Sequence, residues 1–112
     1  MKSVYLLKEE ENDYFKIGIS KNPQGRIKQL QTGSAGHITL YDEFVTEYAS
    51  KIERALHRKY RIYNVNGEWF NLTREQAKAF IQDCQIFEAN FMAIDESRKP
   101  YYDEYQRRNH QH

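Results

Sequence analysis

With 112 residues, 39% of them hydrophobic, and a formal net charge of +1, the chain is the size of one domain around a single core. A single cysteine excludes an internal disulfide, and no apolar run approaches the roughly 18 residues of a membrane span. Because a signal-type amino terminus is also absent, we expect a cytoplasmic protein with no membrane partner.

The charge is distributed unevenly along the chain. Residues 16–61 carry nine basic against four acidic residues, whereas residues 1–15 carry two against four and residues 62–112 carry six against eight. A phosphate backbone responds to local potential more than to net charge. The middle of the chain is therefore a candidate nucleic-acid surface, and a solvated charged face is the alternative.

The first thirty residues predict a β-hairpin and a short helix. Residues 3–7 and 15–20 are expected strands, joined by the acidic loop "KEEEND". In the second strand Lys16 shares one face with Gly18, so the lysine points away from the apolar face. The segment "NPQGRIKQLQTG", with Asn22 as N-cap, predicts a helix of about two turns.

The rest of the chain predicts one further strand at residues 38–44 and two longer helices. Thr46 is the expected cap of a helix over residues 47–60, with an apolar stripe of Ala49, Ile52, Leu56 and Tyr60. After the break "NVNG" and the extended piece "EWFNL", Thr73 and Gln76 form a capping box. The last helix is expected to bury Ala77, Phe80, Ile81, Cys84, Phe87 and Phe91.

This order, β-β-α-β-α-(β)-α, predicts an α/β protein of the α+β type with a small, three- to four-stranded, mainly antiparallel sheet flanked by helices. We assign residues 1–94 to the domain and residues 95–112 to a polar carboxy-terminal tail or short helix. Its aromatic residues Tyr101, Tyr102 and Tyr105 make this tail a candidate surface for a protein partner or a homodimer.

The first hairpin pairs "VYL" with "KIG", which resembles the hairpin that names the GIY-YIG nuclease superfamily. Arg26 stands where that family keeps its arginine, and "KIERALHRKY" resembles its later helix, with Glu53 as the metal-binding glutamate. The resemblance covers about residues 3 to 81. The family expects tyrosine at Lys16, but "FKIG", "IERALH" and "GEWF" together resemble a subgroup of small phage and bacterial proteins in which lysine replaces it.

The resemblance implies a metal-dependent endonuclease that hydrolyses DNA phosphodiester bonds, with Tyr5, Lys16, Arg26, Glu53 and His57 as catalytic residues. Arg26 offers two donors to phosphate oxygens, and Glu53 offers a hard oxygen to Mg²⁺, for which Mn²⁺ may substitute. Tyr5 and Lys16 are expected to position the attacking water, with Lys16 lowering the pKa of the phenol so that Tyr5 acts as base. His57, one turn after Glu53, is an accessory acid or base, a phosphate contact, or a hydrogen-bond partner of Glu53.

The expected partner is DNA, with RNA left open. The expected contacts to the nucleic acid are Lys21, Arg26, Lys28, Arg54, Arg58 and Asn64. Trp69 and Phe70 are interpreted as core residues in preference to base-stacking ones. Two other functions stand beside the nuclease: a catalytically weak nucleic-acid-binding or regulatory module on the same fold, and a protein-interaction role for the aromatic tail.

Overall fold

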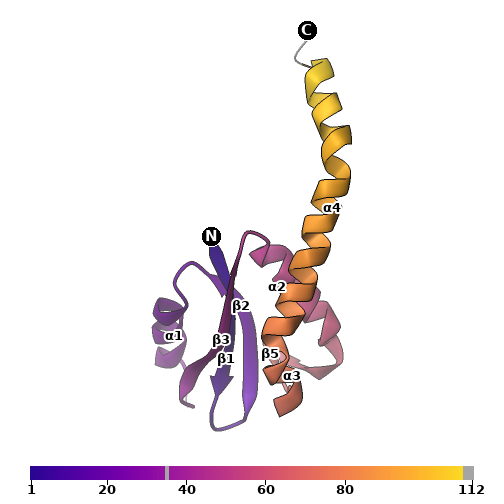
Figure 1. Cartoon of the computed structure of the whole chain (residues 1–112). Coiled ribbons are helices and arrows are strands. Elements are labelled where there is room, and N and C mark those ends of the chain that lie inside the picture. Colours follow the sequence, from indigo (N-terminus) through magenta and orange to yellow (C-terminus); the bar gives the residue numbers. More distant parts are fainter. Residues whose placement is uncertain (35, 110–112) are drawn as a thin grey trace.

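The computed structural model describes residues 1–34 and 36–109, with side chains up to residue 100. Its strands form one antiparallel sheet in the order β3-β1-β2-β5-β4 (Figure 1). The strands are β1 (Lys2–Glu9), β2 (Tyr14–Ser20), β3 (Ile38–Thr46), β4 (Asn64–Asn66) and β5 (Trp69–Phe70). The predicted α+β class is confirmed, and the sheet has five strands because "NVN" pairs with β5 as an additional edge strand.

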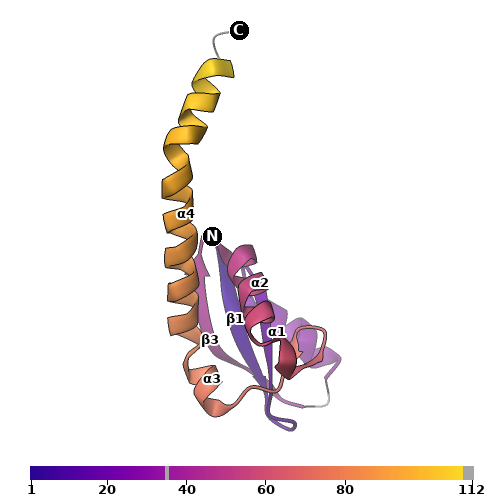
Figure 2. The same ribbon diagram turned by 90° about the vertical axis from the view of Figure 1, so that its right-hand side faces the viewer.

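The helices cover both faces of this sheet. They are α1 (Pro23–Thr32), α2 (Ala49–Lys59), the 3-10 turn η1 (Arg61–Tyr63), α3 (Arg74–Lys78) and α4 (Phe80–Asn109). Figures 1 and 2 place α1 on one face of the sheet and α2 with α4 on the other.

Alternation along the central strands divides the core into two clusters. The larger cluster joins Phe15 and Ile17 of β2 to the buried stripes of α2 and α4, as the sequence predicted. The smaller cluster contains Tyr5 and Leu7 of β1 with Ile38, and α1 packs against it. Lys16 lies between Phe15 and Ile17 and therefore faces the α1 side of the sheet.

The ends of the helices confirm two of the three predicted caps. Asn22 accepts a hydrogen bond from the Gly25 N–H (3.1 Å), and Thr73 forms the capping box with Gln76. The prediction for Thr46 is wrong, because β3 continues to this residue by pairing with Lys2. The Thr46 hydroxyl accepts a hydrogen bond from the Tyr48 N–H (3.0 Å), and α2 begins after Tyr48.

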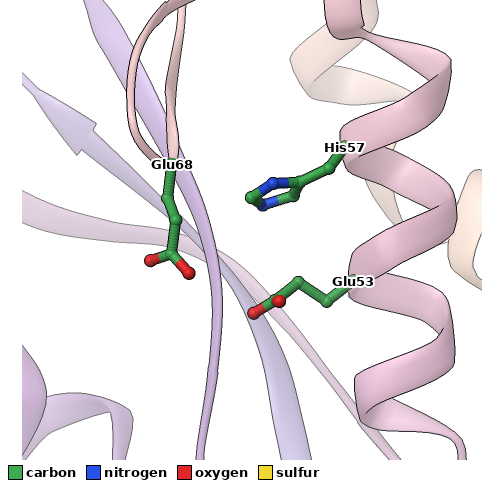
Figure 3. A group of neighbouring side chains, drawn as sticks. All are labelled: Glu53, His57 and Glu68. Carbon is green, nitrogen blue, oxygen red and sulfur yellow. The ribbon is translucent and has the colours of Figure 1, made fainter.

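The helix α2 is held firmly against the sheet and against α4. Ile52 and Leu56 are fully buried beneath it. At its end Asp83 of α4 accepts hydrogen bonds from Lys59 (2.8 Å) and from Tyr60, so this buried carboxylate is satisfied. Glu53 and His57, which directly follow the two buried residues in α2, therefore have a fixed position over the edge of β2 (Figure 3).

The carboxy-terminal helix is longer than the sequence indicated. Residues 95–109 continue α4 as one helix, and residues 92–100 are all exposed, so no buried stripe marks the part of the extension whose side chains are described. Tyr48 anchors the beginning of the extension by donating a hydrogen bond to Asp95 (2.6 Å). The side chains of Tyr101, Tyr102 and Tyr105 lie outside the described part, so the interface expected there stays a prediction. None of the helices in the described ranges is long and apolar enough to cross a membrane.

Candidate active site

The β1–β2 pair brings the first two candidate residues to one face of the sheet. Tyr5 pairs with Gly18, and Lys16 pairs with Leu7 two positions along, so Tyr5 and Lys16 are diagonal neighbours. The phenol of Tyr5 lies directly over Gly18, where a Cβ atom would overlap its ring and hydroxyl. Tyr5 is only 1% exposed, and the glycine of "KIG" is therefore needed to accommodate the tyrosine.

Arg26 reaches this face from the second turn of α1. Its Nη1 donates a hydrogen bond to Gln29 Oε1 (3.1 Å), and its guanidinium lies beside the Tyr5 phenol. Burial raises the pKa of Tyr5, Arg26 offsets part of that rise, and the negative charge of Glu68 adds to it. The phenol therefore stays protonated at neutral pH.

The mid-strand lysine is held in place by β5. Trp69 pairs with Lys16, and the Lys16 Nζ lies 5.6 Å from the centroid of the Trp69 ring, within cation–π range. The same Nζ lies 2.8 Å from an oxygen of Glu68, although Lys16 is only 6% exposed. The buried cation is thus paired with a carboxylate.

A tight hairpin places this carboxylate. Gly67 adopts φ +55°, a left-handed conformation that suits glycine, between β4 and β5. The Asn64 side chain donates to the carbonyl oxygens of Gly67 (2.8 Å) and Trp69 (3.1 Å), and the Ile17 N–H donates to the Glu68 carbonyl oxygen (3.1 Å). The hairpin is therefore fixed to β2 with the Glu68 side chain over the strand edge.

Two further side chains meet Glu68 from α2, as Figure 3 shows. One ligand atom from each of Glu53, His57 and Glu68 lies within 4.8 Å of the others. His57 Nε2 lies 2.9 Å from the carbonyl oxygen of Ile17, and because a carbonyl only accepts, this nitrogen carries the proton. The lone pair on Nδ1 is then the one available to a cation, and the Phe70 ring packs edge-on against the imidazole.

The electrostatics of this group favour a cation. Burial raises the pKa of Glu53, and the nearby Glu68 carboxylate raises it further, while His57, Lys16 and Arg54 act in the opposite direction. The two carboxylates of the group suit Mg²⁺ or Mn²⁺, which favour oxygen ligands, and Mg²⁺ fills its other positions with water and phosphate. A divalent cation here would relieve the repulsion between Glu53 and Glu68.

All five predicted catalytic residues converge on one region. Tyr5 feels the charges of Arg26, Glu53 and Glu68, and Glu53 in turn feels those of His57 and Lys16. One predicted relationship is wrong: the pKa of Tyr5 is raised rather than lowered, because burial outweighs the nearby cations and Lys16 is paired with Glu68. One of the roles considered for His57 was that of a hydrogen-bond partner of Glu53. The Nε2 hydrogen bond of His57 goes to the backbone of β2 and not to Glu53.

The predicted nucleic-acid contacts lie around this region. Lys21 and Lys28 are exposed beside or on α1, and Arg54 and Arg58 are exposed on α2. Asn64 is exposed too, but its amide is used within the β4–β5 hairpin. All six residues remain predicted contacts, and the structure in addition gives the Asn64 amide a structural role within the hairpin.

Sequence reasoning did not select Glu68. The acidic residue stands directly after the stretch 48–67, in which Glu53 is the only acid. The motif "NGEW" carries the signal that could have found it. An Asn-Gly turn that begins a return strand brings the next residues back against the sheet. Identifying Glu68 also requires knowing that the return strand pairs with β2 at Lys16.

Buried Lys16 and the Glu53–Glu68 carboxylates thus meet at the edge of β2, and Arg26 lies beside Tyr5 on the α1 face of the sheet. The chain belongs to the T5orf172 domain family, whose model matches residues 2–85. This domain is found in phage and bacterial nuclease-like proteins, which suggests a nuclease-related or DNA-binding role. Neither the curated proteins nor the solved structures contain a match to the chain.

Proposed function

We propose that the domain is a metal-dependent endonuclease of GIY-YIG type that hydrolyses phosphodiester bonds in DNA. The observation that carries the proposal is the convergence of Glu53 and Glu68 with Lys16 at the edge of β2, with Arg26 beside Tyr5 on the α1 face of the sheet. A carboxylate pair of this kind suits Mg²⁺, and cations beside it suit the phosphate that the metal would share.

Each candidate side chain has a separate role in the proposed reaction. Arg26 donates two N–H groups to the oxygens of the scissile phosphate and stabilises the charge that develops on them. Glu53 and Glu68 would hold Mg²⁺, which when bound would lower the pKa of water and offset charge on the phosphate. The carboxylates of this chain contribute the ligand charge, and Lys16 keeps Glu68 in position by its 2.8 Å ion pair.

Tyr5 has a positioning role in this proposal. Its pKa is raised by burial, so the phenol is protonated at neutral pH and is a poor general base. A neutral hydroxyl packed over Gly18 and beside Arg26 instead fixes the direction of the guanidinium. His57, held by the Ile17 carbonyl, supports the same arrangement from the α2 side.

Cleavage of supercoiled plasmid DNA tests the proposal, with the purified protein in Mg²⁺, in Mn²⁺ and in EDTA. We expect nicked or linear product with either metal and none in EDTA. Glu53→Gln removes a metal ligand charge but retains side-chain size, so it should abolish cleavage while DNA binding persists or improves. Glu11→Gln, an exposed acid in the β1–β2 loop, is the matched control and should cut normally.

The outcome also decides between the nuclease and the alternative on the same fold. If the wild type binds DNA but never cuts it with either metal, the nuclease mechanism is wrong and the protein is a nucleic-acid-binding module. If Glu53→Gln cuts as fast as the wild type, the carboxylate pair is not the metal site.

A further inference from the structure

A cleft of about 560 Å³ opens on the α1 face of the sheet, next to the candidate active site. This size lies within the usual range of small-ligand pockets. The cleft is bounded by α1, by the strand ends that meet at the β1–β2 loop and by the β4–β5 hairpin. Its walls are Glu9, Tyr14, Gln29, Leu30, Gly33, Ser34, Ile38, Val65, Asn66 and Trp69.

The walls suit a flat, neutral ring. Trp69 and Tyr14 provide partly exposed aromatic surface, and the carboxamides of Gln29 and Asn66 provide donors and acceptors. The one charged residue of the lining is Glu9, so the cleft has no cation to attract a phosphate. An anion is disfavoured inside, whereas the N–H groups of a nucleobase match the acceptors.

Two cationic side chains contact residues of the cleft wall without lining the cleft themselves. Arg26 donates to Gln29, a wall residue, at 3.1 Å. On the other side the Lys16 ammonium lies 5.6 Å from the ring centroid of Trp69, also a wall residue. A nucleotide whose base enters the cleft would therefore have its phosphate directed toward Arg26, the cation of this pair that no carboxylate neutralises among the ion pairs of the described residues.

We propose that this cleft binds one unstacked nucleobase of the DNA, next to the phosphate held at the active site. The inference rests on the proposed function and deepens it. A base inside a duplex cannot reach Trp69, so the cleft favours single-stranded or distorted DNA over perfect duplex. Stacking on an aromatic side chain is tolerant of sequence, because every base has a π face.

The only tryptophan of the chain lies in this cleft, so its fluorescence reports occupancy directly. In EDTA, where no cleavage is expected, the full chain is titrated with a single-stranded oligonucleotide and with a fully abasic strand of equal length. Binding of both is followed by the anisotropy of an attached dye. We expect the base-containing strand to bind roughly tenfold or more tightly and to change the Trp69 emission, and the abasic strand to leave it unchanged.

Two variants separate the cleft from the backbone contacts. Trp69→Leu should reduce affinity for the base-containing strand much more than affinity for the abasic strand, because leucine cannot stack on a base. Gly33→Leu provides an independent test, since a Cβ at Gly33 meets no atom within 4 Å and the added side chain occupies open space at the cleft wall. Gly33→Leu should weaken the binding of the base-containing strand only. Circular dichroism checks that this variant is folded.

The outcomes distinguish this inference from the proposed function. If both strands bind equally and quench Trp69 equally, the base pocket is refuted while DNA binding stands. If Gly33→Leu folds and binds the base-containing strand as tightly as the wild type, the pocket is likewise refuted. If neither strand binds at low salt, both the proposed function and the nucleobase pocket are refuted.

Discussion

Replacing Glu53 by glutamine should stabilise the metal-free protein. The Glu53 carboxylate is partly buried and lies within 4.8 Å of a ligand atom of Glu68, and both effects raise its pKa. Two unit charges 4.8 Å apart repel by about 3.5 kcal/mol at an effective dielectric constant of about 20. Lys16 and solvent at the 39% exposed Glu68 side chain offset most of this, and we expect about 1 kcal/mol to remain.

The sign of the pH dependence follows from the raised pKa. The folded state holds the Glu53 proton more tightly than the unfolded state, so this contribution to stability is complete below the ordinary value of 4.5. It is lost as the pH rises through the folded-state pKa. The variant should therefore gain about 4 °C in Tm over the wild type at pH 7.5 and nothing at pH 4.

Divalent metal should reverse the order at neutral pH. At a Mg²⁺ concentration ten times Kd, the wild type gains about 1.4 kcal/mol, whereas a variant without the ligand charge gains much less. Thermal unfolding followed by circular dichroism, in EDTA and in Mg²⁺, measures both effects, with Glu11→Gln as the control. The reasoning is refuted if Glu53→Gln is less stable than the wild type in EDTA at pH 7.5, or if Mg²⁺ stabilises the two equally.

Three further predictions concern other residues of the site and core. Arg26→Lys should keep the fold, but its rate of single-turnover cleavage should fall about a hundredfold, because the ammonium cannot bind two phosphate oxygens side by side. A rate near that of the wild type would mean that Arg26 is a surface residue without a catalytic role. Gly18→Ala should lower the free energy of unfolding by about 1–3 kcal/mol in urea titrations, since the added Cβ overlaps the Tyr5 phenol. Gly33→Ala, whose Cβ meets nothing within 4 Å, should leave the free energy of unfolding nearly unchanged, and equal effects of the two variants would contradict the close approach of Tyr5 to Gly18. Burial raises the pKa of the Cys84 thiol to about 12, so a disulfide reagent at pH 8 should label Cys84 only after the protein is unfolded in urea. Fast labelling of the native protein would contradict the buried position of this thiol.

Local patterns predicted much of the fold and most of the site. Alternation in "DYFKIGIS" put Lys16 on the face opposite Phe15 and Ile17, Asn22 fixed the start of α1 and hence the position of Arg26, and helical spacing put Glu53 and His57 on one face. Each of these signals lies within a few residues of the chain. For that reason they can be interpreted without knowing the tertiary structure.

The remainder depended on contacts that no local pattern contains. Glu68 joins the site through the pairing of β5 with β2, a contact between segments distant in sequence. The pKa of Tyr5 depends on how deeply the sheet and α1 bury it, so proximity to a lysine gave the wrong sign. The extension of α4 is exposed along residues 92–100, and apolar periodicity cannot detect a helical segment whose residues, like these, are all exposed.

The rate of DNA cleavage by Glu68→Gln tests the central claim most directly, because only the structure places this residue in the site. Single-turnover cleavage of a labelled oligonucleotide is measured across a range of Mg²⁺ concentrations for the wild type, Glu68→Gln and the Glu11→Gln control. We predict that Glu68→Gln loses roughly tenfold or more at low Mg²⁺ and recovers in part as Mg²⁺ rises, since one of two carboxylate ligands has been removed. An unchanged rate with unchanged Mg²⁺ dependence would contradict a metal-dependent phosphodiesterase site built on Glu53 and Glu68.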